Sequence, residues 1–158
     1  MDTARIRWVT ELLTETELDL VIETLSYERE AHGSHFVQLA DPMFVRRTLK
    51  AISSWGQVGK CYIDGNFAGI VYWDLGAVWW SPETILMEQL VLCVNPYFAG
   101  FGRRACDYLE QIAKENHINI IVAGCLFQKN PQMITNLYKK KGFLTVNPLY
   151  IKQMGGTE

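Results

Sequence analysis

The first part of the chain alternates polar and apolar residues and then changes to a helical period. The alternation over residues 5–9 predicts a half-buried strand. Thr14 and Glu17 have the spacing of a capping box, which predicts the start of a helix. Asp41-Pro42 predicts a second helix start, since aspartate is a good N-cap and proline suits the first turn. The apolar residues of the two helical stripes are Leu18, Val21, Ile22 and Leu25, then Val45, Leu49 and Ile52.

The middle of the chain has the pattern of strands. Residues 60–63 and 67–73 flank Asp64-Gly65-Asn66, which predicts a hairpin turn because its residues tolerate positive φ. A loop containing the Trp-Trp-Ser-Pro segment at 79–82 is expected next. Residues 85–94 are largely apolar, which is typical of a strand that is buried on both faces.

The last third predicts helix, strand, helix and strand. An apolar stripe from Ala105 to Ala113 marks a helix, and residues 118–122 form a short apolar strand. Asn130-Pro131 begins the last main helix, and Gly142 ends it where a left-handed residue is favoured. Residues 143–152 are expected to form a closing strand. The order of elements predicts one α/β (α+β) domain over residues 1–158, built around a mostly antiparallel sheet.

Composition restricts the class of protein. The 158 residues are 49% hydrophobic and 20% charged, which fits a globular domain of ordinary size and excludes long disorder. A formal net charge of -2 argues against nucleic-acid binding through phosphate contacts. The sequence has neither an apolar run near the ~18 residues that cross a bilayer nor a secretory signal. We therefore expect a cytoplasmic protein without a membrane or nucleic-acid partner.

Cysteine and histidine spacing gives no sign of a metal site or a disulfide scaffold. The four cysteines are Cys61, Cys93, Cys106 and Cys125. They form no C-x-x-C pair and lie in apolar-rich stretches, so we expect buried, reduced thiols. The one close histidine pair, His32-x-x-His35, has no third or fourth ligand nearby. No metal is expected.

The segment Gly100-x-Gly102 follows a buried strand and precedes a helix. Glycine lets the main chain approach a ligand, and the first-turn amides of a helix lie at the positive end of its dipole. Arg103 and Arg104 add positive charge beside this turn. The pattern predicts a phosphate or pyrophosphate site, with a purely structural turn as the alternative. It matches neither the dinucleotide motif, since position 105 is Ala, nor a P-loop.

Tyr138 lies near the end of the last helix, just before Gly142-Phe143. In isolation, a tyrosine on this apolar stripe is readily explained as part of the core. Its phenol is also able to donate a proton. The pattern around Tyr138 alone leaves both interpretations open.

Together, these segments resemble the GNAT superfamily of acyl-CoA N-acyltransferases. The resemblance extends from Ile6 to Lys152 in the family's order of elements. It is carried by residues 90–96 with Gly100-Phe101-Gly102, and by Asn130-Pro131 through Tyr138-x3-Gly142-Phe143. The Asn-Pro helix start and the Trp-containing loop look most like small acetyltransferases of phages and prophages. Tyr97 departs from the family's usual turn, which leaves a second register open, with Gly102 first and Arg104 last.

The resemblance implies a mixed, mostly antiparallel sheet whose fourth and fifth strands are parallel and splayed, with helices on both faces. It also implies that acetyl-CoA is a cosubstrate and that its pantetheine arm enters the gap between those two strands. The residues expected to contact the pantetheine are Leu92, Cys93 and Val94, through their main chain, and Asn130. The residues expected to hold the pyrophosphate are Phe98, Ala99, Gly100, Phe101, Gly102, Arg103 and Arg104.

The implied reaction is direct attack of a primary amine on the thioester. Only about one lysine-like amine in a few thousand is neutral at pH 7, so a base is needed. Glu88 is the candidate base, with a solvated strand-edge charge as the alternative, and Glu83 is a poorer candidate. The resemblance gives Tyr138 the role of protonating the leaving thiolate. An amide near Val94 is expected to stabilise the oxyanion, and Cys93 is not expected to be a nucleophile.

The expected function is therefore that of an acetyl-CoA-dependent N-acetyltransferase. The acceptor, whether a small molecule or a protein, cannot be identified from the sequence. The alternative from another class is a non-catalytic acyl-CoA-binding or protein-interaction module on the same fold. A homodimer is also left open.

Overall fold

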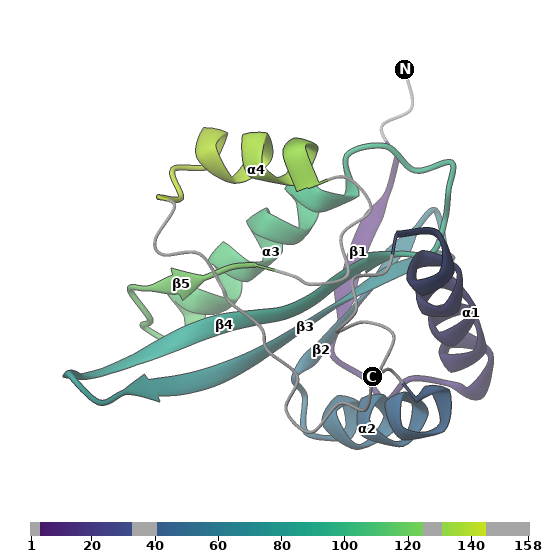
Figure 1. Ribbon diagram of the computed structural model, residues 1–158, viewed down its shortest axis with the longest axis horizontal. Helices are drawn as coiled ribbons and strands as arrows, with labels where there is room; N and C mark the ends of the chain where they lie inside the picture. The colour runs from purple at the N-terminus through teal and green to yellow at the C-terminus, as the bar shows by residue number, and fades with distance from the viewer. Residues whose placement is uncertain (1–3, 33–40, 125–130, 145–158) are drawn as a thin grey trace, which may run out of the picture.

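A five-stranded sheet forms the centre of the molecule, with helices on both faces (Figure 1). The computed structural model describes residues 4–32, 41–124 and 131–144. The elements in chain order are β1 (Ile6–Val9), α1 (Glu15–His32), α2 (Pro42–Ser54), β2 (Val58–Ile63), β3 (Asn66–Val78), β4 (Ser81–Cys93), α3 (Phe101–Glu115), β5 (Ile121–Val122) and α4 (Pro131–Lys140). Neighbouring strands are antiparallel except β4 and β5, which are parallel. The predicted fold class is confirmed.

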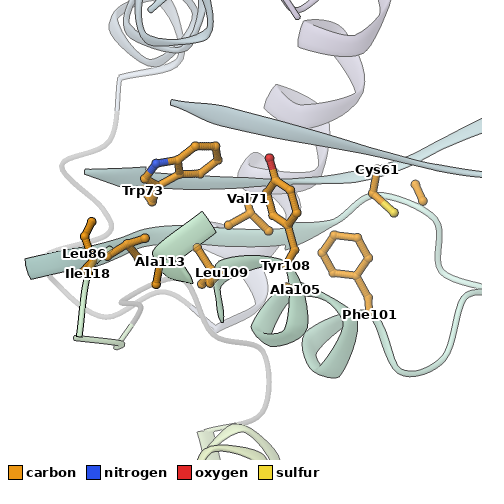
Figure 2. Packing of buried hydrophobic residues seen from close by; sticks show 11 residues of the cluster. Cys61, Val71, Trp73, Leu86, Phe101, Ala105, Tyr108, Leu109, Ala113 and Ile118 are labelled. Carbon is orange, nitrogen blue, oxygen red and sulfur yellow. The ribbon is translucent and has the colours of Figure 1, made fainter. Parts of the chain in front are cut away.

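Each face of the sheet has its own hydrophobic core. On one face, α1 and α2 pack with the sheet through Leu13, Leu18, Val21, Leu49, Ile52, Val58, Ile70, Leu90 and Leu92. On the other, α3 packs through Cys61, Ala68, Val71, Trp73, Leu86, Phe101, Ala105, Tyr108, Leu109, Ala113 and Ile118, most of which are shown in Figure 2. Burial of this apolar surface is the main force that holds the helices to the sheet.

Two glycines of the sheet make room for the aromatic residues of α3. A Cβ at Gly59 would lie 2.3 Å from Cε1 of Tyr108. A Cβ at Gly69 would lie 2.7 Å from Cζ of Phe101. The Tyr108 ring also stacks on Trp8 of β1, with centroids 4.4 Å apart. The N-terminal half of α3 therefore lies close against β2 and β3.

The first two helices begin where the sequence predicts. The Thr14 amide donates to Glu17 Oε1 at 2.9 Å, and the Glu17 amide donates to Thr14 Oγ1 at 3.1 Å, which completes the capping box. Asp41 Oδ1 accepts from the amides of Met43 and Phe44 at 2.9 and 3.2 Å. Both helix starts are thus stabilised by side chains that satisfy first-turn amides.

The long hairpin of β3 and β4 corrects the loop that the sequence predicted around 79–82. Only Trp79-Trp80 forms the turn, because Val78 pairs with Ser81, and the ribbon extends beyond the other strands (Figure 1). Pro82 lies within the register shift between Ala77 and Val78, where it has no partner on β3. Proline is tolerated there because no ladder bond needs its missing N–H.

Two further strand boundaries differ from prediction. β5 comprises only Ile121–Val122 of the expected 118–122, and β2 begins at Val58 instead of residue 60. Apolar character at residues 118–120 reflects packing in part, since Ile118 is buried in the core below α3. Most of the closing strand predicted over 143–152 lies outside the described residues.

A β-bulge in β4 changes which face its side chains occupy. Tyr72 pairs with Leu90 and Trp73 pairs with Glu88, so Gln89 is the extra residue. Before the bulge, Leu86 and Glu88 point to the face covered by α3 and α4. After it, Leu90 and Leu92 point to the face covered by α1 and α2. The bulge therefore places Glu88 on the α4 side of the sheet.

Candidate functional site

Glu88 of β4 and Tyr138 of α4 are in direct contact. The Tyr138 hydroxyl donates a hydrogen bond to Glu88 Oε2. Glu88 is 5% exposed, so the alternative of a solvated strand-edge charge is wrong. The structure thus brings together the two side chains that the sequence analysis selected for chemistry. Glu88 comes before β5 in the sequence and Tyr138 comes after it, so only the folded chain brings the two side chains together.

The environment of Glu88 favours its neutral form. Burial raises the pKa of its carboxyl, and the hydrogen bond from Tyr138 lowers it in part. Glu88 Oε1 is buried and has no hydrogen-bond partner among the described residues. Burial, with a smaller contribution from the charge of nearby Glu88, raises the pKa of the Cys106 thiol of α3 to about 12. The pair is therefore able to hold a proton that an exposed glutamate would release.

Contacts between α4 and α3 fix the position of Tyr138. A Cβ at Gly102 would lie 3.0 Å from Leu137 Cδ2, and Lys141 Nζ pairs with Asp107. Gly142, with φ 89°, ends the helix in the left-handed conformation that the sequence predicted. The chain then returns, and the Phe143 ring lies 5.1 Å from the Tyr138 ring. Tyr138 is held by its neighbours on both sides in the sequence.

The parallel pairing of β4 with β5 covers only a short stretch of β4. Leu86 pairs with Ile121 and Met87 with Val122, and β4 has no further β5 partner among the described residues. The Val94 amide donates to the Ala68 carbonyl at 2.8 Å, so it faces β3. Val94 is therefore not free to donate to an oxyanion, which corrects the expectation for this amide.

Alternation along β4 then assigns the remaining main-chain groups. Leu92 pairs with Ile70 and faces β3 like Val94, whereas Cys93 and Val91 direct their N–H and C=O groups to the opposite side. Of the three predicted main-chain contacts to the pantetheine, Cys93 has its main-chain groups on the open side. Val91 shares this orientation and was not selected from the sequence. The sequence carries no signal for it, because its orientation depends on the bulge at Gln89, which resets the alternation.

The first turn of α3 presents free amides. Gly100 is the N-cap, with φ 82°, and it supplies no side-chain hydrogen bond. The amides of Phe101, Gly102 and Arg103 have no main-chain acceptor in the part of the chain that the structure describes. Together with the helix dipole, these amides fit an anionic group such as a phosphate.

Other members of the predicted pyrophosphate set have different surroundings. The Phe98 amide donates to the Asn95 carbonyl and the Arg104 amide to the Gly100 carbonyl, both at 3.2 Å. The Arg103 and Arg104 side chains are exposed, as is Ala99. The Phe101 side chain is buried in the core. Asn130, predicted to contact the pantetheine, lies outside the described residues.

The cysteines within the described residues are free thiols in apolar surroundings. Burial raises the pKa of Cys61 to about 11. It also raises the pKa of Cys93, whose Sγ donates to the Asn95 carbonyl at 3.1 Å. Protonated thiols of this kind are poor nucleophiles. Cys125 lies outside the described residues.

The described residues contain no group of three or more His, Cys, Asp or Glu side chains placed to hold a metal ion. His35, from the close histidine pair, lies outside them. In the same part of the chain, no helix combines the length and apolar character needed to cross a membrane.

The three tryptophans near the end of β3 separate into two groups. Trp73 is buried beside Tyr108. Trp79 and Trp80 are 93% and 69% exposed at the tip of the ribbon, with their rings 87° apart. At about 3.3 Å per residue, the tip is well over 10 Å from Glu88 along the strand. The tryptophan pair is therefore not part of the site around Glu88.

Solved structures with the same architecture are acetyltransferases. A GCN5-related N-acetyltransferase from Ralstonia eutropha JMP134 matches with a TM-score of 0.69 and 17% identity, over 97% of this chain and 100% of that one. A predicted acetyltransferase from Clostridium acetobutylicum, solved with acetyl-CoA, matches with a TM-score of 0.66 and 13% identity, over 96% and 97%. The aminoglycoside N-acetyltransferase AAC(6')-Iy, solved with CoA, matches with a TM-score of 0.63 and 9% identity, over 98% of each chain.

These matches establish that the chain has the fold of GCN5-related N-acetyltransferases over nearly its whole length. No protein-family model matches the sequence, and no curated protein has a significantly similar sequence. The expected phage or prophage origin receives no support from the structural matches.

Proposed function

We propose that the protein is an acetyl-CoA-dependent N-acetyltransferase that transfers an acetyl group to a primary amine by direct attack. The observation that carries the proposal is the Glu88–Tyr138 pair beside the parallel strands β4 and β5. In a fold shared with acetyltransferases, a half-buried phenol paired with a buried carboxyl is a proton donor held in a fixed place. Tyr138 and Glu88 are the side chains assigned to the chemical step.

The free main-chain groups on two elements fit the nucleotide thioester. The first-turn amides of α3, next to the αL residue Gly100, would hold the pyrophosphate. The outward N–H and C=O groups of Cys93 and Val91 would pair with the amides of the pantetheine arm. Arg103 and Arg104 are exposed beside this turn and would add positive charge. When bound, acetyl-CoA supplies an activated acyl group.

The proposal also covers the partners and the place of action. We assign the protein to the cytoplasm, with acetyl-CoA and an amine as its partners, and without a metal or nucleic acid. The amine belongs either to a small molecule or to a protein. One domain spans residues 1–158, and a homodimer is the assembly to be tested.

The proposal is tested first by binding and then by turnover. Calorimetric titration of the purified protein with CoA is expected to show saturable, one-site binding. Release of free thiol from acetyl-CoA is then measured with a panel of polyamines, aminoglycosides and peptides with free N-termini or lysines. Acetylated proteins in a lysate, identified by mass spectrometry, would define a protein acceptor. Absence of CoA binding at millimolar concentration would refute the proposal.

The exposed tryptophan pair favours a second candidate function. Trp79 and Trp80 lie at the tip of a projecting ribbon, where large apolar side chains are typical of an interaction surface. A non-catalytic acyl-CoA-binding or protein-interaction module would use such a surface. Tight CoA binding without turnover for any acceptor, and no effect of changes at Tyr138 or Glu88, would support this candidate instead.

A further inference from the structure

Both oxygens of the Glu88 carboxyl are removed from solvent. Oε2 accepts the hydrogen bond from Tyr138, and Oε1 is buried without a partner among the described residues. A base that takes a proton from an incoming amine must reach that amine directly or through one water. The geometry gives Glu88 a contact with Tyr138 and no open oxygen for the amine.

Among the described residues around Glu88, the Tyr138 hydroxyl stabilises a negative charge only in part, and burial outweighs it. Tyr138 of α4 is its hydrogen-bond donor, and the Cys106 thiol of α3 lies near enough to interact with its charge. None of the ion pairs found among the described residues includes Glu88. A carboxylate that is buried without a cation is strongly disfavoured, so the group takes up a proton instead.

On this basis we infer that Glu88 acts through Tyr138: it orients the phenol and returns a proton to it after Tyr138 has protonated the leaving thiolate. Glu88 is then a positioning residue and proton store, and the proton of the amine leaves by another route. This inference rests on the proposed acetyltransferase function, and it assigns Glu88 a role other than that of the base.

The proton transfers balance as follows. In the resting pair, Tyr138 donates to Oε2 of a neutral Glu88 whose own proton is on Oε1. As the carbon–sulfur bond breaks, the Tyr138 O–H bond breaks and its proton forms the S–H bond of the thiol. The carboxyl of Glu88 rotates and gives its proton to the Tyr138 phenolate. A solvent proton restores Glu88 after the thiol leaves, and the proton lost by the amine goes to solvent.

The relative acidities of a phenol, a thiol and a carboxylic acid explain why Tyr138 benefits from a second proton donor. A phenol with an ordinary pKa of about 10 is a weaker acid than a thiol near 8.5, so transfer from an isolated tyrosine to a thiolate is unfavourable by about thirtyfold. A carboxylic acid with an ordinary pKa of about 4.3 is much more acidic than the thiol, and burial narrows this difference. Coupling to Glu88 therefore makes protonation of the leaving group favourable overall.

The activity test compares Glu88→Gln, Tyr138→Phe and the double variant with wild type. Glutamine keeps the size of the side chain but has no carboxyl proton to transfer. Each single variant is expected to lower kcat about 10- to 100-fold and to change the KM for acetyl-CoA less than about threefold. The double variant is expected to match the slower single variant, because both residues serve one path. Multiplied losses would mean independent roles and would overturn the inference. The matched control is Glu115→Gln, an exposed residue at the far end of α3.

The pH dependence separates the two roles of Glu88 by sign. If Glu88 supplies a proton, the ratio of wild-type kcat to that of Glu88→Gln falls as pH rises through the pKa of Glu88. If Glu88 is the base for the amine, the same ratio rises with pH, since the ionised form is then the active one. A rising ratio would overturn the inference while leaving the acetyltransferase proposal intact.

A third measurement does not depend on turnover or on the acceptor. Infrared difference spectra of the CoA-loaded protein at pH 7 are expected to show the C=O stretch of a protonated carboxyl. This band should vanish in Glu88→Gln and shift in Tyr138→Phe, which removes the hydrogen bond. An ionised Glu88 at pH 7, or a band unaffected by Tyr138→Phe, would overturn the inference. Failure of CoA to bind would refute the proposed function, a result that calorimetry distinguishes from either spectral outcome.

Discussion

Gly102 of α3 leaves the space that the Leu137 side chain of α4 occupies, since a Cβ at Gly102 would lie 3.0 Å from Leu137 Cδ2. Leu137 immediately precedes Tyr138, so this contact sets how closely the helix that carries the phenol approaches α3. The sequence pattern predicted a phosphate-binding turn at Gly102, with a purely structural turn as the alternative. The structure adds a packing role, which links the start of α3 to the position of Tyr138.

A Gly102→Val substitution is expected to push α4 away from α3. Overpacking of this kind lowers the free energy of unfolding by about 1–3 kcal/mol, to be measured by urea denaturation. Displacement of Tyr138 should also lower turnover more than CoA affinity. Lys114→Val, at an exposed position of the same helix, controls for the helix propensity of valine. Equal stability of the two variants would contradict the packing role.

Alanine substitutions at the two glycines under α3 are expected to cause two different kinds of steric clash. Gly59→Ala would place its Cβ against side-chain atoms of Tyr108, whereas Gly69→Ala would place its Cβ 2.2 Å from the Leu92 carbonyl oxygen. Both variants should lose stability in urea. Adding Tyr108→Ala should then cost less in the Gly59→Ala background than in wild type. Phe101→Ala should give no comparable relief to Gly69→Ala, because the carbonyl remains. If Phe101→Ala fully restored the stability of Gly69→Ala, this result would show that β3 and β4 separate easily at this position.

The buried pair of Glu17 and Lys60 joins the start of α1 to β2. Lys60 Nζ donates to Glu17 Oε1 and to the Leu12 carbonyl, each at 2.9 Å, and Tyr62 donates to Glu17 Oε2. Lys60→Met would leave the buried carboxylate without its cation, which should lower the free energy of unfolding by about 3 kcal/mol. Lys50→Met breaks the exposed pair with Glu15 and should change this free energy much less, because exposed ion pairs are solvated and screened. If urea denaturation showed similar losses of unfolding free energy for the two variants, the distinction between the buried and the exposed ion pair would be contradicted.

Acid should destabilise the protein in part through Glu17. Burial alone would raise the pKa of Glu17, but hydrogen bonds from the Thr14 amide, Tyr62 and Lys60 outweigh it and hold the pKa below the ordinary value of 4.5. A depressed pKa contributes stability that is present above 4.5 and is lost as pH falls through the folded-state pKa. In a series of urea unfolding curves from neutral to acid pH, Glu17→Gln should show a smaller decline than wild type. A parallel decline would exclude Glu17 as a source of acid sensitivity.

Gly100 offers a test of the proposed pyrophosphate site that separates strain from binding. Alanine at its φ of 82° should cost roughly 1–2 kcal/mol of stability and should weaken CoA binding by distorting the first turn of α3. Asparagine tolerates this conformation better, so Gly100→Asn should retain more affinity. Gly56→Ala introduces similar strain at φ 76° outside α3 and should leave CoA affinity unchanged. Calorimetry that finds equal CoA affinity in all three variants would remove Gly100 from the binding site.

The elements predicted best depend on residues that are close together in the chain. Thr14 and Glu17 satisfy each other's amides within one turn, and Asp41 and Gly142 act on the helix ends next to them. Their effect is local, so the spacing of residue types was enough to place them. The order of strands also followed from alternation and turn residues, and it led to the correct fold class.

The features predicted wrongly depend on pairing between strands. Asp74, Gly76 and Pro82 are poor strand residues by propensity, yet they lie in the ribbon because cross-strand pairing continues past Trp73. The engagement of the Val94 amide by Ala68 is likewise a property of the β3–β4 register. A single sequence carries no signal for where a register shifts.

From residue order alone, the chain specified its helix caps, its hydrophobic stripes and its glycine turn, and the family resemblance added Glu88 and Tyr138 as the side chains with suitable chemistry. Their contact required the assembled molecule. The bulge at Gln89 turns Glu88 toward α4, and the packing of Leu137 against Gly102 sets the height of Tyr138 above the sheet. The hydrogen bond then joins residues 50 positions apart. Contacts at that separation form through burial of whole faces, whose geometry is a sum over many residues and is not encoded in any short pattern.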